Sequence, residues 1–495
     1  MRDTPRRRAA LWLFAALLGV ASALFDQRGV SPEFRSADAV EYALMARRLA
    51  HGEGFTTNLI YPPALWLGLE SAPAVKYAPL WPLVLAGPFA AFGADPAVAR
   101  GVLVALFAAL VATSAALAAA RGGLVAGALA AVAVALLPET RLLALDAVSE
   151  TLFALTIALT LLAFARSASP FAVGVCAGLA YLTRYNGAVL LPVLLALLLA
   201  RERGRPRAAL ACLTGFLAVT TPWWIRNLVV TGSPFYTLLE LNVWVSPDPT
   251  PLGGSLFFQT EPGRDTAAAA DPLAKLARQL PFLLSRLPFA SANLAAFAGV
   301  LLGCLHRDLL CLVFGAIGAA TLVAVALALP QGRYLAPLLP AMIALGSAAW
   351  MRHGGRLRIP ALALMLLAPA LPRVPAELPD LALLRGAWEA ERAAGPAAPS
   401  RETPAALRAC LAGHPVVIAE TAPRLAFDTD AIVIFSPLSP PEFWRIVEAQ
   451  PVAFAQRRGA GNLSPERFGE EFAQRPDCGP GLYERRARPA TSTEP

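Results

Sequence analysis

Long apolar runs separated by short polar segments fill most of the chain. A helix needs about 20 apolar residues to cross a bilayer, and fewer where neighbouring helices shield it. We therefore predict eleven crossings, at about 9–25, 97–120, 123–139, 148–165, 170–183, 187–200, 208–222, 282–303, 309–329, 333–350 and 359–371. The run 79–93 is apolar but short and interrupted by prolines. This pattern favours a re-entrant or interfacial element over a further crossing.

The arginines support this count. Basic residues collect in cytoplasmic loops, and eleven crossings put the main basic clusters on that side: Arg121, Arg166, 201–207, Arg307 and 352–358. Counting 79–93 as a crossing would put the next three clusters outside. The N-terminus is then cytoplasmic, while the tail and the polar loops 26–96 and 222–281 are extracytoplasmic. Acids and bases that are scattered along the sequence thus converge on one face.

Composition agrees with a membrane protein: 57% of the residues are hydrophobic and 15% are charged, against about 25% charged in soluble domains. The net charge of +8 forms no basic stripe on a soluble domain, so we expect no nucleic-acid partner. We predict an all-α polytopic module at 1–371 and a small extracytoplasmic α/β domain at 372–495. In that tail we expect strands 414–420, 431–435 and 451–456 and a helix at 441–448. Cys410 and Cys478 can form a disulfide there if the tail is extracytoplasmic.

The polar stretch 36–80 holds the first candidate residues. Asp38 begins a helical pattern, so it is either a helix cap or a catalytic acid. Lys76, one of two lysines in the chain, suits a phosphate as a mobile point charge, or it extends towards the membrane interface as isolated lysines do. A long polar loop between crossings must lie in water or line a cavity, because lipid cannot satisfy its backbone.

Two further acids flank the start of the crossing at 148–165. Asp146 and Glu150 are one helical turn apart, which would put both on one helix face near Arg141. A carboxylate at the head of a membrane helix is costly without a partner, which favours a functional role. The alternative is a second helix cap.

Three single arginines lie at the outer ends of crossings, where basic residues are disfavoured. Arg184, Arg226 and Arg333 would suit a phosphate or pyrophosphate if they share one cavity, or they pair with the acids above. With four histidines and no His-rich spacing, we expect no dedicated zinc site. Walker, GxSxG and Rossmann motifs are lacking, so we do not predict nucleotide hydrolysis.

These segments, in this order, resemble those of the GT-C membrane glycosyltransferases, in particular bacterial relatives of protein O-mannosyltransferases and of the lipid A aminoarabinose transferase. The resemblance covers the chain from its first crossing to Trp350. It rests on six strings: SADAVEYALMARRLAHGEGF, VKYAPLWPLVLA, RLLALDAVSETLFAL, GLAYLTRYNGAVLLP, TPWWIRNLVVTGSPF and GRYLAPLLPAMIAL. One departure is that many relatives have Asp-Glu where this chain has Asp38-Ala39, with Glu41 as the next acid.

The resemblance implies roles for these residues. Asp38 would be the catalytic base, Lys76 would bind the lipid phosphate, and the second acid would be Asp146 or Glu150. The remaining motif residues are expected to bind substrate: Glu41, Tyr42, Tyr77, Arg184, Arg226, Arg333 and Tyr334. Two or three acids near a phosphate permit a divalent cation without requiring one.

The resemblance also predicts the reaction: an inverting glycosyltransferase of the bacterial cytoplasmic membrane. It would move a sugar from a polyprenyl-phosphate donor to an extracytoplasmic hydroxyl of a protein, lipid or glycan acceptor. One alternative is a transporter or flippase of a lipid-linked glycan, although the internal repeats typical of transporters are not evident. Another is a surface-glycan polymerase or ligase, which would use similar chemistry on a different acceptor.

Overall fold

The structure is a computed structural model. It describes residues 4–28, 32–142, 144–201, 206–238, 272–290, 294–328, 332–367, 390, 393, 403–437, 440–456, 463–479 and 481–486. The chain forms two compact units. We call Met1–Glu33, Tyr77–Tyr236 and Pro272–Ala398 the helical unit, and Phe34–Lys76, Thr237–Asp271 and Pro399–Pro495 the sheet unit.

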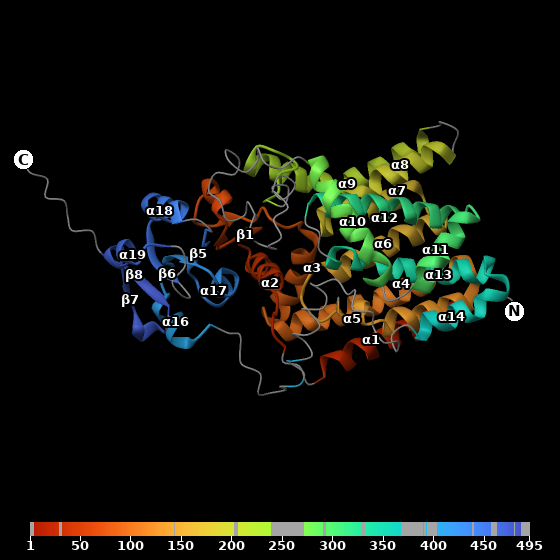
Figure 1. Ribbon diagram of the computed structural model, residues 1–495, viewed down its shortest axis with the longest axis horizontal. Coiled ribbons are helices and arrows are strands. Elements are labelled where there is room, and N and C mark those ends of the chain that lie inside the picture. Colours follow the sequence, from red (N-terminus) through yellow and green to blue (C-terminus); the bar gives the residue numbers. More distant parts are fainter. Residues whose placement is uncertain are drawn as a thin grey trace, which may run out of the picture. The chain divides into compact units, whose positions relative to one another are not determined.

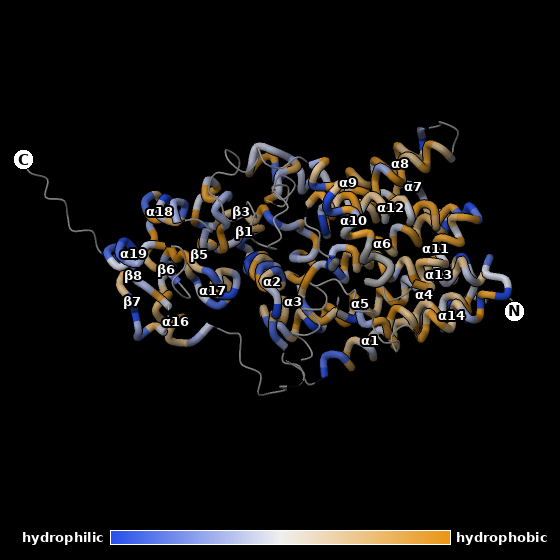
Figure 2. Tube along the Cα trace, viewed as in Figure 1, coloured by the Kyte–Doolittle hydropathy of each residue, from blue (hydrophilic) through white to orange (hydrophobic). Residues whose placement is uncertain are grey.

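The helical unit consists of apolar helices (Figure 1), which are hydrophobic along most of their length (Figure 2). Its α-helices are α1 Pro5–Gln27, α3 Leu80–Phe92, α4 Pro96–Leu136, α5 Pro138–Leu142, α6 Glu150–Ala165, α7 Pro170–Thr183, α8 Leu190–Arg201, α9 Arg207–Thr231, α10 Pro272–Ala290, α11 Leu294–Leu305, α12 Leu309–Leu327, α13 Leu339–His353 and α14 Arg358–Leu367. Short 3₁₀ turns join some of them: η2 Tyr185–Val189, η6 Gly332–Tyr334, η7 Ala336–Leu338 and η8 Gly355–Leu357. Among the described residues, α1, α4, α9 and α12 are long and apolar enough to cross a membrane.

Close helix contacts in this unit use small residues. The 41-residue α4 is broken at Gly123, which has φ +81°, and a Cβ added at Gly127 would clash with the carbonyl oxygen of Ala115. The two halves of α4 therefore fold back on each other, where the sequence predicts that one crossing ends and the next begins. Between α7 and α9, Gly174 and Gly215 leave no room for a Cβ. Small residues let membrane helices approach closely.

Several predicted crossings coincide with helices, and two do not. The predicted 170–183 has the bounds of α7, but α9 continues through Pro222 to Thr231. Segment TPWWIRN is therefore helical and does not open a loop. Proline is tolerated inside membrane helices where neighbouring groups satisfy the freed backbone. The predicted crossing 282–303 is divided between α10 and α11. The count of eleven crossings stays a prediction.

The sheet unit combines the first polar loop with the tail. Its loop elements are α2 Ala37–Ala50, β1 Thr56–Thr57, β2 Leu59–Ile60, η1 Pro62–Leu67 and β3 Ala72–Pro73. Its tail elements are α16 Ala405–Cys410, β4 Val416–Ala419, α17 Ala422–Asp428, β5 Ile432–Phe435, α18 Pro440–Ala449, β6 Val452–Gln456, α19 Pro465–Glu471, β7 Phe472–Gln474, η11 Pro476–Cys478 and β8 Leu482–Arg485. The sheet has the order β2-β5-β4-β6-β8-β7. Its first four strands are parallel to each other, β8 is antiparallel to β6, and β7 is antiparallel to β8.

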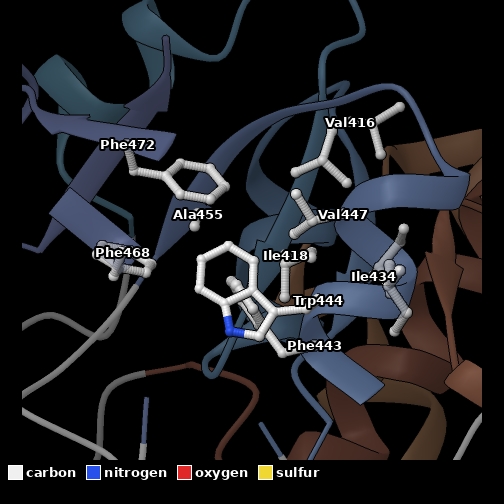
Figure 3. Close-up of a cluster of buried hydrophobic side chains, with 11 residues drawn as sticks. Val416, Ile418, Ile434, Phe443, Trp444, Val447, Ala455, Phe468 and Phe472 are labelled. Carbon is white, nitrogen blue, oxygen red and sulfur yellow. The ribbon is translucent and has the colours of Figure 1, made fainter. Parts of the chain in front are cut away.

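The core of this unit lies between the sheet and α18 (Figure 3). Val416 and Ile418 of β4 face Phe443 and Trp444 of α18. Since successive strand residues point to opposite faces, Val417 faces the other side, where α17 packs. The three strands and the helix expected in the tail are confirmed, whereas α17, α19, β7 and β8 were not predicted. Cys410 and Cys478 are disulfide-bonded.

The first loop contributes a strand to this sheet. Leu59 and Ile60 of β2 pair in parallel with Val433 and Ile434 of β5. Asn58 donates through Nδ2 to the carbonyl oxygens of Ala426 and Ala431, at 3.0 and 2.8 Å. A two-residue strand has no detectable periodicity, so the sequence could not predict this pairing. The predicted division of the chain at 371/372 follows composition and membrane topology, and it stays a prediction. By packing, residues 34–76 belong to the same compact unit as the tail.

Candidate active site

Asp38 lies in the first turn of α2, in the sheet unit. Ser36 is the N-cap, and its Oγ accepts a hydrogen bond from the Ala39 amide at 3.1 Å. Asp38 is therefore not the cap, although the positive end of the helix dipole also stabilises a carboxylate in the first turn. Its side chain is half-buried. Glu41 follows three residues later on the same helix face.

Glu41, Tyr61 and Lys76 form a buried cluster. Glu41 Oε1 accepts hydrogen bonds from Tyr61 OH at 2.7 Å and from Lys76 Nζ at 2.9 Å. Lys76 Nζ also lies 2.5 Å from Tyr61 OH and 4.5 Å from the centre of the Tyr61 ring. The side chains of Glu41 and Lys76 are 8% and 14% exposed. A lysine this enclosed does not extend into solvent as an interfacial lysine would.

The main chain around Lys76 is held by the residues that follow α9. Thr237 donates through Oγ1 to the Lys76 carbonyl oxygen at 2.9 Å, and the Leu238 amide donates to the Val75 carbonyl oxygen at 3.2 Å. Strands β1 and β3 pair as an antiparallel ladder upstream. Lys76 is thus fixed from both its side chain and its backbone.

The surroundings perturb the protonation of two members of the cluster. Burial raises the pKa of the Glu41 carboxyl above its ordinary value. The positive charge of Lys76 opposes this shift, and the negative charge of Asp38 adds to it. Burial and the Glu41 carboxylate raise the pKa of Tyr61 well above its ordinary value. Tyr61 is therefore a fixed hydrogen-bond donor, and Glu41 takes up a proton more readily than an exposed glutamate.

A second group lies in the helical unit around Tyr334. Arg184 Nη1 is 3.0 Å from Glu150 Oε1 and donates to Ser149 Oγ, also at 3.0 Å. Its guanidinium lies 4.7 Å from the centre of the Tyr334 ring. Arg333 lies 5.1 Å from the same ring and donates to Tyr334 OH at 3.2 Å. Two of the three predicted arginines therefore share one tyrosine, and one of them is paired with an acid.

Arg226 is held differently. Its guanidinium lies 4.8 Å from the centre of the Trp223 ring, and its Nη1 donates to Asn227 Oδ1 at 3.1 Å. Tyr77 is buried, and its carbonyl oxygen accepts from Tyr185 OH at 3.2 Å. Tyr42 is buried on α2 in the sheet unit.

The expected helical relation between Asp146 and Glu150 is wrong. Glu150 begins α6, but residues 144–147 form turns, and the Ala147 amide donates to Asp146 Oδ1 at 3.0 Å. Trp81 of α3 donates through Nε1 to the Ala147 carbonyl oxygen at 2.8 Å, so the turn is satisfied without a helix. The two acids therefore do not share a helix face.

Arg141 pairs with an acid that the sequence did not single out. Its Nε donates to Asp26 Oδ2 at 2.5 Å, and Asp26 is 2% exposed. This ion pair joins the end of α1 to α5. It is a structural partner for Arg141, which was expected beside Asp146.

The described residues do not supply a clear metal site. Their one group of three ligand side chains within reach of each other is Cys410, Asp477 and Cys478. Both of its sulfur atoms are in the disulfide. Asp38 joins no such group among the described residues.

No protein-family model matches the sequence, and no curated protein matches it either. Solved structures do match the fold. ArnT from Cupriavidus metallidurans bound to undecaprenyl phosphate matches with a TM-score of 0.57 and 15% identity, over 93% of this chain and 94% of that chain. The archaeal oligosaccharyltransferase from Archaeoglobus fulgidus in complex with Zn and sulfate matches with a TM-score of 0.59 and 14% identity, over 90% of this chain and 67% of that chain.

This chain has the GT-C fold. The resemblance expected from the six motifs is thereby confirmed at the level of the fold. The GT-C neighbours are polytopic membrane proteins, and the helical unit of this chain likewise has helices long and apolar enough to cross a membrane. The ArnT match extends over nearly the whole of both chains, tail included.

Within this GT-C chain, sequence reasoning found Glu41 and Lys76 but missed Tyr61, which joins them. Tyr61 follows Leu59-Ile60 and precedes Pro62-Pro63, a context that indicates a turn and nothing about chemistry. It also missed Asp26, which stands at the end of an apolar helix and looks there like an ordinary boundary residue.

Proposed function

We propose that the chain is an inverting glycosyltransferase of the bacterial cytoplasmic membrane. It would move a sugar from a polyprenyl-phosphate donor to an acceptor hydroxyl on the extracytoplasmic face. The observation that carries the proposal is the buried lysine cluster of Lys76, Glu41 and Tyr61, in a chain whose fold matches ArnT bound to undecaprenyl phosphate over almost its full length. AglB from the same archaeon was solved with a dolichol-phosphate, which also supports a lipid phosphate as the donor group.

In this proposal Asp38 is the general base. Its carboxylate takes the proton of the acceptor hydroxyl while the oxygen forms a bond to the anomeric carbon. The bond from that carbon to the phosphate oxygen breaks at the same time, and its electron pair stays on the phosphate. Lys76 stabilises the charge that grows on the leaving group. A single displacement requires the base and the leaving group on opposite faces of the sugar, so the anomeric configuration inverts.

The other polar residues take supporting roles. Glu41 and Tyr61 orient the Lys76 amine through the hydrogen bonds described above. Arg184 and Arg333, which flank Tyr334, are candidates for binding phosphate oxygens within the helical unit. Of Asp146 and Glu150, we favour Asp146 as the second functional acid. Glu150 is 3% exposed and is committed to Arg184, whereas Asp146 is half-buried in a turn.

The disulfide supports the proposed orientation. Disulfides persist in oxidising compartments and are rare in the cytosol, so the bond between Cys410 and Cys478 is consistent with an extracytoplasmic tail. The arginine distribution independently favours the same side. Labelling of the half-buried Cys410 with a membrane-impermeant reagent, after reduction, tests it. Labelling in intact cells is expected, and labelling only after the cells are permeabilised would reverse the topology.

The decisive experiment follows the donor. Membranes with the wild type or Asp38→Asn are offered a panel of polyprenyl-phosphate sugars, and loss of each lipid-linked form is measured. Consumption of one donor by the wild type but not by the variant supports the proposal and identifies the sugar. Equal consumption by both removes Asp38 from its role. A product with retained anomeric configuration refutes the single displacement, and flipping of a lipid-linked glycan without consumption would favour the transporter.

A further inference from the structure

The tail's sheet ends beside the candidate phosphate-binding lysine. Strand β2 of the first loop runs parallel to β5 of the tail, with Ile60 opposite Ile434. The next residue along each strand is aromatic, and this register brings the two rings together. Tyr61 and Phe435 stack with their centroids 5.3 Å apart and their planes at 17°. In open sheets with parallel strands, ligands bind outside the carboxyl ends of the strands, which is where both rings lie.

Tyr61 links this stack to Lys76. Its hydroxyl lies 2.7 Å from Glu41 Oε1 and 2.5 Å from Lys76 Nζ, and Nζ also lies 4.5 Å from the ring centre. The direction of the hydroxyl depends on the orientation of the ring. Whatever fixes the ring therefore fixes the partner of the lysine amine.

We propose that Phe435 is a positioning residue for Lys76. By stacking on Tyr61 it fixes the orientation of that ring, and Tyr61 in turn holds the Lys76 amine against Glu41. The proposal rests on the proposed function in one respect, the assignment of Lys76 to the donor phosphate. It makes the tail a part of the site: a side chain more than 350 residues further along the chain sets the geometry of the first-loop lysine.

The stack restricts the freedom of the lysine side chain. A lysine side chain has four rotatable bonds and loses much rotamer freedom when it is fixed. Each contact that holds it therefore raises the fraction of molecules in which the lysine has the held conformation. A stacked aromatic pair adds about 0.5–1.5 kcal/mol beyond burial. Converted at about 1.36 kcal/mol per tenfold change, its loss should change the population of the held lysine roughly two- to tenfold. An aliphatic side chain in place of Phe435 would keep apolar volume and lose the stack.

Phe427 provides a matched control in the same unit. Like Phe435, it is a half-buried aromatic residue of the tail that contacts the first loop. Its ring packs edge-on against Phe34 at 5.3 Å, and its carbonyl oxygen accepts from Arg47 at 2.6 Å. Phe427→Leu should therefore weaken the same interface between loop and tail without touching Tyr61.

The experiment uses amine reactivity of the full chain in lipid nanodiscs. The sequence has two lysines, Lys76 and Lys275, so acetylation by limiting acetic anhydride can be read for each by peptide mass spectrometry. Lys275 lies in α10 of the helical unit, outside the sheet unit that carries the substitutions, so its labelling serves as an internal reference. The variants are Phe435→Leu, Phe435→Tyr, which keeps the ring, and Phe427→Leu. The KM for the donor and kcat are measured in parallel.

We expect Phe435→Leu to raise labelling of Lys76 relative to Lys275 by about two- to tenfold, and to lower kcat/KM for the donor. Phe435→Tyr and Phe427→Leu should label like the wild type. Wild-type labelling of Lys76 in Phe435→Leu overturns the proposal, and so does an equal rise in Phe427→Leu, which would indicate general loosening. If the wild type consumes no donor, the proposed function fails, while the labelling still decides whether Phe435 positions Lys76.

Discussion

Replacing Tyr61 with phenylalanine tests the buried cluster most directly. The change removes one oxygen atom and leaves the ring, so it opens almost no cavity and keeps the stack on Phe435. What is lost is the hydroxyl, which lies 2.7 Å from Glu41 Oε1 and 2.5 Å from Lys76 Nζ. Glu41 and Lys76 then have one fewer partner each in a buried site.

The magnitude follows from the charge on both partners. A hydrogen bond to a charged group contributes about 1.5–3 kcal/mol, and about 1.36 kcal/mol corresponds to a tenfold change. If Lys76 holds the donor phosphate and stabilises the charge on the leaving group, its misplacement should lower kcat/KM for the donor by about 10- to 150-fold. The loss should appear in both KM and kcat, because the phosphate is bound in the ground state and gains negative charge in the transition state.

The assay is the initial rate of donor consumption as a function of donor concentration, with the wild type, Tyr61→Phe and a control. Tyr483→Phe serves as the control, because Tyr483 is a half-buried tyrosine of β8 whose ring packs on Phe468 at 5.1 Å. The control should have wild-type constants. A kcat/KM for Tyr61→Phe within twofold of the wild type would refute the reasoning, since Lys76 would then act on its ligand without help from the hydroxyl.

Three further predictions concern protonation, a buried ion pair and the disulfide. Burial raises the pKa of Glu41, so the folded protein binds this proton more tightly than the unfolded chain, and the group destabilises the fold as pH rises from about 4.5. The melting temperature of the wild type relative to that of Glu41→Gln should therefore rise as pH falls from 7. A difference in melting temperature that stays constant with pH would contradict the shift. Arg184→Gln should cost about 3–5 kcal/mol by leaving Glu150 buried without its cation, whereas Arg184→Gln with Glu150→Gln should recover most of it in thermal unfolding. Cys410→Ser should lower the melting temperature by roughly 10 °C, since the bond closes a long loop with a sequence separation of 68; equal melting of the reduced and oxidised protein would contradict this.

The sequence predicted the elements that carry strong local signals. Apolar runs bounded by Arg and Pro gave α7 its bounds, and the arginine at 121 marked the break in α4 near Gly123. Short continuous apolar runs predicted β4, β5 and β6. These signals arise from burial along a single segment, so one segment is enough to recognise them.

The sequence was wrong where the outcome depended on neighbours. It ended α9 at Pro222, but the helix continues because the freed backbone can be satisfied within a bundle. It put Asp146 and Glu150 on one helix face, but the Ala147 carbonyl oxygen finds a donor in Trp81 and the backbone turns instead. Neither partner is visible within the segment itself.

The sequence by itself predicted apolar helices of membrane-spanning length and a small α/β tail, because the length of an apolar run is a property of consecutive residues. It also singled out Asp38, Glu41 and Lys76, through motifs that lie within one loop. Only the tertiary structure decided that Tyr61 joins Glu41 to Lys76 and that Phe435 stacks on Tyr61. Those contacts depend on the pairing of β2 with β5, and the register between two strands so far apart in the chain is set by the packing of the whole sheet.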